Sequence, residues 1–149
     1  MRDYLFRGKQ KDNGKWVYWN IYGEICTSKG RRTRLTRKTP YGEKYFYHIY
    51  EIKQLIDPET VGQYTGLTDK NGKKVFEGDV IQNKLFRFVI KYGAYIPSAY
   101  CKEIFKRETI GFYAFDGERE YQLGNYTKTL EVIGNIHDNP ELMKGGEEE

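Results

Sequence analysis

Three turn signals constrain the fold of this chain most strongly. An Asn-Gly or Asp-Gly pair lies between short apolar runs at Asn13-Gly14, Asn71-Gly72 and Asp116-Gly117. Such pairs favour tight β-hairpins because they tolerate positive φ angles, and the first predicts a type I′ turn. The chain also has 14 Tyr, 8 Phe and 2 Trp. Aromatic side chains suit the pleated, half-buried surface of a sheet, so we expect a mainly β fold of several hairpins.

The segments between these turns predict further strands and one or two short helices. Residues 45–52 are apolar on both faces, which is typical of a buried strand. Helical spacing of apolar residues indicates a short amphipathic helix over Ser98–Arg107, and Asn139-Pro140 predicts a final helical turn. Residues 26–44 carry almost no apolar side chains and are broken by glycine and proline, so we expect a long mobile loop there.

The length of 149 residues allows one core or two small ones. We expect a single β-rich domain over residues 1–138, or an N-terminal subdomain 1–56 followed by a barrel-like subdomain 57–138. Residues 139–149 are expected to form a short helical turn and a disordered acidic tail.

The location is predicted to be the bacterial cytoplasm. Cys26 and Cys101 lie far apart in sequence, which argues against a disulfide framework or a zinc site. The first residues are charged throughout, and no apolar run approaches the roughly 20 residues that a membrane span needs. We therefore expect no membrane association.

The stretch "YTGLTDKNGKKVFEGDVI", from Tyr64 to Ile81, could be a reactive site or a structural frame. A phosphate loop is not favoured, because no Gly-Lys-Ser or Gly-Lys-Thr follows its glycines. Asp69, Glu77 and Asp79 could pair as acid and base or hold magnesium, but the motif contains no histidine. Asp79 after Gly78 is instead expected to accept hydrogen bonds from nearby amides. We favour the frame, with no catalytic residue, no metal ligand and no cofactor.

Charge is concentrated in one segment. Residues 29–44 hold seven cations and one anion, a net charge of +6, whereas the whole chain carries +4. These cations could neutralise phosphates, and nearby tyrosines, Tyr47 among them, could stack on unpaired bases. The other interpretation is a solvated loop. The nucleic-acid-binding candidates are Lys29, Arg31, Arg32, Arg34, Arg37, Lys38, Tyr41 and Tyr45.

Two stretches resemble the signatures of a known family. "YTGLTDKNGKKVFEGDVI" and "LEVIGNIHDNPEL", from Leu130 to Leu142, resemble those of the YopX protein family, and "MRDYLFRG" is similar to its start. The resemblance implies a mainly β fold and a phage or prophage origin, and it brings no catalytic residues to transfer. The "EGDVI" stretch and the strand after it are also similar to the start of SH3-like barrels, an analogy of fold only.

Two function classes follow. The first is a non-catalytic binding module encoded by a phage or prophage, whose partner is nucleic acid or a phage or host protein, and which could form a homo-oligomer. The second is a metal-dependent, nuclease-like enzyme using Asp69, Glu77 or Asp79. We favour the first.

Overall fold

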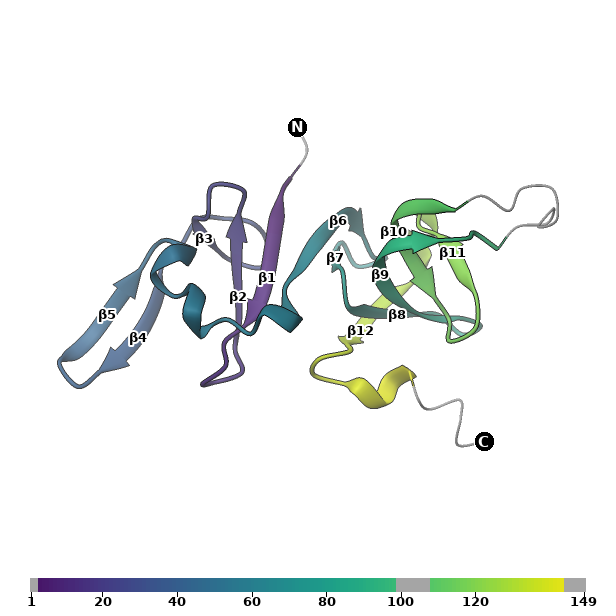
Figure 1. Ribbon diagram of the computed structural model, residues 1–149. Coiled ribbons are helices and arrows are strands. Elements are labelled where there is room, and N and C mark those ends of the chain that lie inside the picture. Colours follow the sequence, from purple (N-terminus) through teal and green to yellow (C-terminus); the bar gives the residue numbers. More distant parts are fainter. Residues whose placement is uncertain (1–2, 99–107, 144–149) are drawn as a thin grey trace. The chain divides into compact units, whose positions relative to one another are not determined.

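The computed structural model describes residues 3–98 and 108–143, and strands dominate these ranges (Figure 1). The prediction of a mainly β fold is confirmed. Within the described ranges the helices are short 3-10 segments. The helix predicted over Ser98–Arg107 falls, after its first residue, outside the described residues, as does the acidic tail. The chain divides into two compact units, Met1–Gly66 and Leu67–Glu149. Whether they behave as one domain or as two subdomains stays a prediction.

Unit 1 contains a sheet in which the strands follow the order β3-β2-β1-β6, together with a separate hairpin of β4 and β5 (Figure 1). The chain passes into unit 2 along β6. The elements of this unit are β1 (Leu5–Lys9), β2 (Trp16–Asn20), β3 (Ile25–Cys26), β4 (Leu35–Thr39), β5 (Gly42–Phe46), η1 (Ile49–Glu51), η2 (Lys53–Leu55), η3 (Pro58–Thr60) and β6 (Gly62–Thr68).

The first predicted hairpin is present, but its turn type was wrong. β1 and β2 pair antiparallel from Leu5 opposite Asn20 to Lys9 opposite Trp16. A type I′ turn needs positive φ at both central residues, whereas only Gly14 has it here, at +67°. The connection is longer than two residues, because the amide of Gln10 donates to the carbonyl of Lys15.

The long loop predicted over residues 26–44 was wrong in its second half. Residues 35–46 form the β4–β5 hairpin, with Leu35 opposite Phe46 at its base. Pro40 and Gly42, which indicated a loop, form its turn, and Gly42 adopts a φ of +108°. Leu35 and Phe46 pack against the buried cluster of Val17, Ile25, Ile52 and Ile56, so two apolar residues suffice to anchor a polar hairpin.

The buried strand predicted over residues 45–52 was also wrong. β5 ends at Phe46, and 3-10 helices follow from Ile49. The ring of His48 accepts a hydrogen bond from the amide of Tyr50, and the carboxylate of Glu51 accepts one from the amide of His48. These side-chain bonds cap a helical turn and compete with strand pairing. Of this apolar run, Ile52 enters the core.

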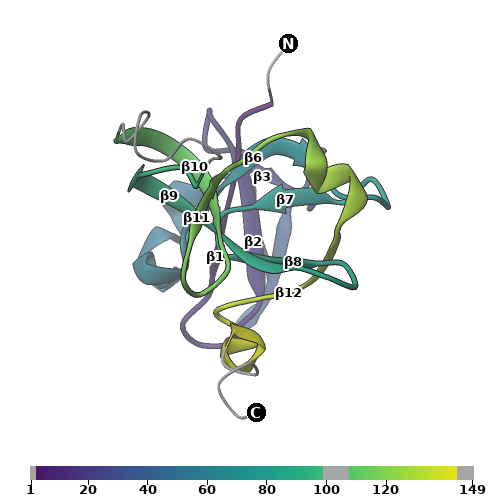
Figure 2. The same cartoon turned by 90° about the vertical axis from the view of Figure 1, so that its right-hand side faces the viewer.

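Unit 2 contains an antiparallel sheet with strand order β11-β10-β9-β8-β12, in which β12 lies beside β8 (Figure 2). Buried residues of these strands form its core with Val75 and Leu130. β11 and β12 lie at the two opposite edges of this sheet, so its strand order does not show closure into a barrel. The SH3-like barrel therefore stays a prediction. The elements are β7 (Lys74–Phe76), β8 (Asp79–Gln82), β9 (Arg87–Tyr95), β10 (Thr109–Phe115), β11 (Glu120–Gln122), η4 (Asn125–Thr129), β12 (Glu131–Asn135) and η5 (Pro140–Met143).

The buried carboxylate of Asp69 fixes the turn after β6. One of its oxygens accepts hydrogen bonds from the amides of Asn71 and Lys73, at 2.8 and 2.9 Å. The other accepts one from the amide of Val132 at 3.0 Å. The amide of Lys70 also donates to the carbonyl of Leu130. This turn is therefore bound to the beginning of β12, 63 residues later in the chain.

Asp79 also supports a turn by accepting a backbone hydrogen bond, as the sequence predicted. Its carboxylate accepts a hydrogen bond from the amide of Phe76 at 2.8 Å, across a turn in which Gly78 has a φ of +93°. The backbone of Gly78 also donates to Ile90 and accepts from Ile136. The two hairpins predicted at Asn71-Gly72 and Asp116-Gly117 and the helical turn after Asn139 are present.

The turn at Asn71-Gly72 yields a test of backbone strain. Gly72 has a φ of +78°, and a Cβ there would meet no atom within 4 Å. Gly72→Val should therefore lower the free energy of unfolding by about 1–3 kcal/mol, through backbone strain alone. Gly124 has equally open space but extended backbone at φ −161°, so Gly124→Val is the matched control. Urea unfolding measures the free energy of unfolding of both variants. An equal loss of stability in the two would contradict the assignment of the effect to the positive φ of Gly72.

The Asp69 carboxylate yields a test with a pH dependence. Burial opposes ionisation, but the hydrogen bonds from Val132, Lys73 and Asn71 prevail and hold the pKa of Asp69 below its ordinary value of 3.8. Asp69→Asn should cost about 1–3 kcal/mol at pH 7, because a buried amide N–H would lose its acceptor.

Since the folded pKa of Asp69 lies below the unfolded one, the stabilisation is present above pH 3.8 and is lost as the pH falls further. The difference in melting temperature between wild type and Asp69→Asn should therefore shrink below about pH 4. A difference that stayed constant from pH 7 to pH 3 would contradict this account.

Candidate nucleic-acid interface

The short strand β3 brings together side chains from three parts of unit 1. The amide of Ile25 donates to the carbonyl of Tyr47 at 2.8 Å, and the amide of Thr33 donates to the carbonyl of Ile25 at 2.9 Å. Single β-bridges join Glu24 to His48 and Cys26 to Arg32. The backbone at β3 is therefore held in register by the cationic segment and by the residues that follow β5.

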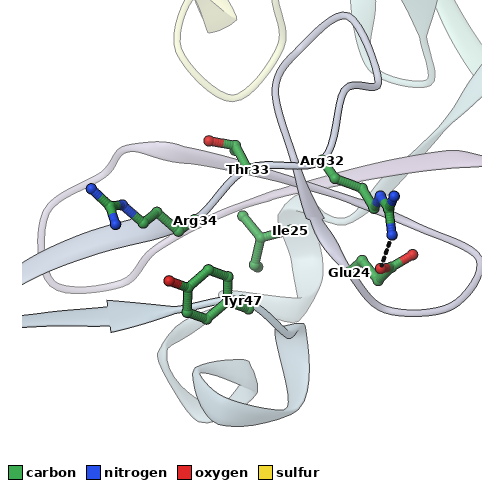
Figure 3. A pocket seen from close by; sticks show the side chains of 6 residues that line it. All are labelled: Glu24, Ile25, Arg32, Thr33, Arg34 and Tyr47. Atoms are coloured by element: carbon green, nitrogen blue, oxygen red, sulfur yellow. Dashed lines mark hydrogen bonds and ion pairs between the residues drawn. The ribbon is translucent and has the colours of Figure 1, made fainter.

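A pocket of about 560 Å³ opens at this junction. It is lined by Glu24, Ile25, Arg32, Thr33, Arg34 and Tyr47. Figure 3 shows Ile25 between Arg34 and Tyr47 on one side and the Arg32–Glu24 pair on the other. Two cations, one carboxylate and one aromatic ring thus surround an apolar floor.

The carboxylate of Glu24 is held in place by two donors. The side-chain amide of Asn20 donates to one oxygen at 3.0 Å, and the guanidinium of Arg32 donates to the other at 3.2 Å. These bonds lower the pKa of Glu24, that from Asn20 the most, so the group is anionic at neutral pH. Arg32 keeps a highly exposed side chain despite this ion pair.

The β4–β5 register divides the cations of the hairpin between two faces. Residues directly opposite one another share a face, and faces alternate along a strand. Arg37 lies opposite Lys44 on the face that carries Leu35 and Phe46 toward the core. The other face, called the outer face here, consists of Arg34, Thr36, Lys38, Glu43 and Tyr45.

Arg37 is engaged within the protein. Its guanidinium donates to the side chain of Gln10 and forms an ion pair with Asp12. The hydrogen bond from Arg37 is the main reason that the pKa of Asp12 is lowered. Its side chain is 20% exposed, whereas that of Arg32 is 75% exposed. Of the predicted cations, Arg37 therefore serves the fold, and Lys29, Arg31, Arg34 and Lys38 face solvent.

The tyrosines of the hairpin differ in what they can offer to a ligand. Tyr41 lies at the turn and is fully exposed. Tyr45 is 40% exposed, and the guanidinium of Arg34 already lies over its ring, 4.0 Å from the centroid. Tyr47, whose ring lines the pocket, is 58% exposed. Tyr41 and Tyr47 are thus better placed than Tyr45 to stack on a base.

Sequence inspection did not identify Glu24, Ile25 or Thr33 as pocket residues. Glu24 precedes the cationic segment, and Ile25 reads as an ordinary strand residue. Their proximity to Tyr47 follows from the pairing of β3, which has only two residues and gives no periodicity. No local sequence signal could have indicated it.

Two of the three carboxylates of the enzymatic alternative, Asp69 and Asp79, serve the backbone of unit 2. Asp69 accepts three amide hydrogen bonds, and Asp79 accepts one from Phe76; both are buried. Across residues 3–98 and 108–143, no group of three His, Cys, Asp or Glu side chains is arranged to hold a metal ion. Cys26 is buried with a free thiol, and Cys101 lies outside the described residues.

In the part of the chain that the structure describes, no helix has the length and apolar character to cross a membrane.

Comparison with known families identifies the chain. The family model described as YopX protein matches residues 5–144. The chain belongs to the YopX protein family. The resemblance inferred from Tyr64–Ile81 and Leu130–Leu142 is thereby confirmed, and the match includes both units.

A crystal structure of protein EF1440 from Enterococcus faecalis is similar to this YopX family member over most of both chains. The two are 20% identical, the match covers 94% of this chain and 97% of that one, and the TM-score is 0.39. No curated protein matches the chain.

Proposed function

We propose that this YopX family member is a non-catalytic binding module, encoded by a phage or prophage, that binds nucleic acid through unit 1 in the bacterial cytoplasm. The observation that carries the proposal is the outer face of the β4–β5 hairpin and the pocket beside it. Exposed cations lie there with exposed tyrosines, and the core of the unit is built from other residues.

Phosphate neutralisation is the main source of affinity in this proposal. Lys29 and Arg31 are exposed in the segment that precedes β4, and Arg34 and Lys38 are exposed on the outer face. Each cation that contacts a phosphate releases counterions, so affinity falls as salt rises. Such contacts carry no sequence information, and we expect binding that is weak and nearly independent of sequence.

The absence of catalysis is part of the same proposal. Asp69 and Asp79 support turns of unit 2, so changing either should act on folding. If nucleic acid does not bind, two alternatives are left for the outer face: a solvated surface or a protein-docking surface.

A salt titration tests the proposal. Four phosphate contacts predict a slope of log affinity against log salt of about −3.6 for duplex and about −2.8 for single strands. Arg34→Ala should flatten this slope by about 0.9 on duplex and about 0.7 on single strands. Fluorescence anisotropy with labelled oligonucleotides, from low to moderate salt, measures the slope.

Arg37→Ala is the matched control, since it removes the same charge three residues further along the chain. Because Arg37 contacts Gln10 and Asp12, its removal should leave the slope unchanged while lowering stability. A thermal melt of each variant separates the two effects. Absence of binding at low salt would overturn the proposal. Equal flattening by both variants would show that net charge, and not the outer face, controls binding.

A further inference from the structure

The pocket beside β3 has features that phosphate binding alone does not require. Neutralising phosphates requires only exposed cations, whereas this open pocket measures about 560 Å³ and is lined by an apolar side chain, an aromatic ring and a carboxylate as well. Pockets of roughly 300–1,000 Å³ are typical of small-molecule sites. Its floor is the apolar side chain of Ile25, its wall is the ring of Tyr47, and a fixed carboxylate stands at its far side.

We infer that this pocket takes a single unpaired nucleobase, which makes single-stranded nucleic acid the substrate class of unit 1. The inference rests on the proposed function. The base stacks on the ring of Tyr47, and the guanidinium of Arg34 at the pocket rim contacts the adjoining phosphate. The exposed ring of Tyr47 supplies the stacking surface, and stacking tolerates any base because every base has a π-face.

The Arg32–Glu24 pair is complementary to the hydrogen-bonding edge of such a base. The guanidinium of Arg32 donates and the carboxylate of Glu24 accepts, and the two groups lie 3.2 Å apart in the pocket. Every common nucleobase carries an adjacent donor and acceptor on its Watson–Crick edge, and that edge is accessible in single strands. The pair therefore selects for unpaired bases without selecting strongly among them.

Arg32 and Glu24 have more hydrogen-bonding positions than their contact with each other and with Asn20 uses. A carboxylate has about four acceptor positions and a guanidinium five N–H donors. Asn20 and Arg32 use one position on each oxygen of Glu24. Since the pKa of Glu24 is lowered, the carboxylate accepts hydrogen bonds at neutral pH.

The experiment measures the affinity of the full chain for three probes: an oligothymidylate of twelve nucleotides, an abasic oligonucleotide of the same length, and a duplex. At fixed salt, the abasic probe should bind at least about fivefold more weakly than oligothymidylate, the lower limit for loss of one stacked base. Tyr47→Ala should weaken oligothymidylate binding by a similar factor and leave abasic binding unchanged. Tyr47→Phe, which retains the ring, should bind as wild type does.

Tyr92→Ala is the control, because Tyr92 lies on β9 in unit 2 and is 56% exposed, close to the value for Tyr47. It should change none of the three affinities. If Tyr47→Ala proves unfolded in a thermal melt, Tyr47→Leu, which keeps an apolar side chain but no aromatic ring, takes its place with the same expected result.

The outcomes separate the two proposals. If no probe binds, the proposed function fails, and the inference fails with it. If oligothymidylate, abasic and duplex probes bind alike, the proposed function stands and the base pocket is overturned. A preference for oligothymidylate that persists in Tyr47→Ala would also overturn the pocket, since the stacking residue would then lie elsewhere.

Discussion

The carboxylate of Asp69 is the interaction on which unit 2 depends most. It closes the turn after β6 through Asn71 and Lys73, and it ties that turn to Val132 at the beginning of β12. The pairing of β8 with β12 then continues the same connection. The two stretches that carry the family resemblance are therefore neighbours in space. A buried carboxylate that accepts three amide hydrogen bonds stabilises a backbone path and is poorly suited to bind a metal ion or move a proton.

Unit 1 depends on a different constraint, the register of the β4–β5 hairpin. Because Leu35 lies opposite Phe46, the alternate positions Thr36, Lys38, Glu43 and Tyr45 are directed away from the core. A shift of one residue would direct Arg34 and Lys38 toward the apolar cluster instead. The same register that anchors the hairpin thus produces the outer face. The cations of this segment divide between the fold and the surface: Arg37 pairs with Asp12, whereas Arg34 is exposed and lies over the ring of Tyr45.

Local sequence signals predicted the local parts of the fold. The glycine turns at Gly14, Gly72 and Gly117 all adopt positive φ, and Asp79 accepts the amide hydrogen bond expected of it. Errors arose where a contact distant in sequence, or a local side-chain cap, decided the outcome. Residues 35–46 were too polar to predict a strand, yet Leu35 and Phe46 anchor them to the core. Residues 45–52 were apolar enough for a strand, yet His48 and Glu51 cap a helical turn. The candidate cations were predictable as a group, but their division between two faces, and the pocket beside β3, required the pairing register.

The central claim is that ligand binding belongs to the hairpin side of unit 1, whereas Tyr64–Ile81 is structural. Amide chemical shifts followed by NMR during titration with a single-stranded oligonucleotide test this claim most directly. We expect shifts to concentrate at residues 24–25 and 29–47, with the amides that donate to Asp69 and Asp79 unaffected. Shifts centred on Asp69, Glu77 and Asp79, with residues 29–47 unchanged, would contradict the account and restore the enzymatic alternative.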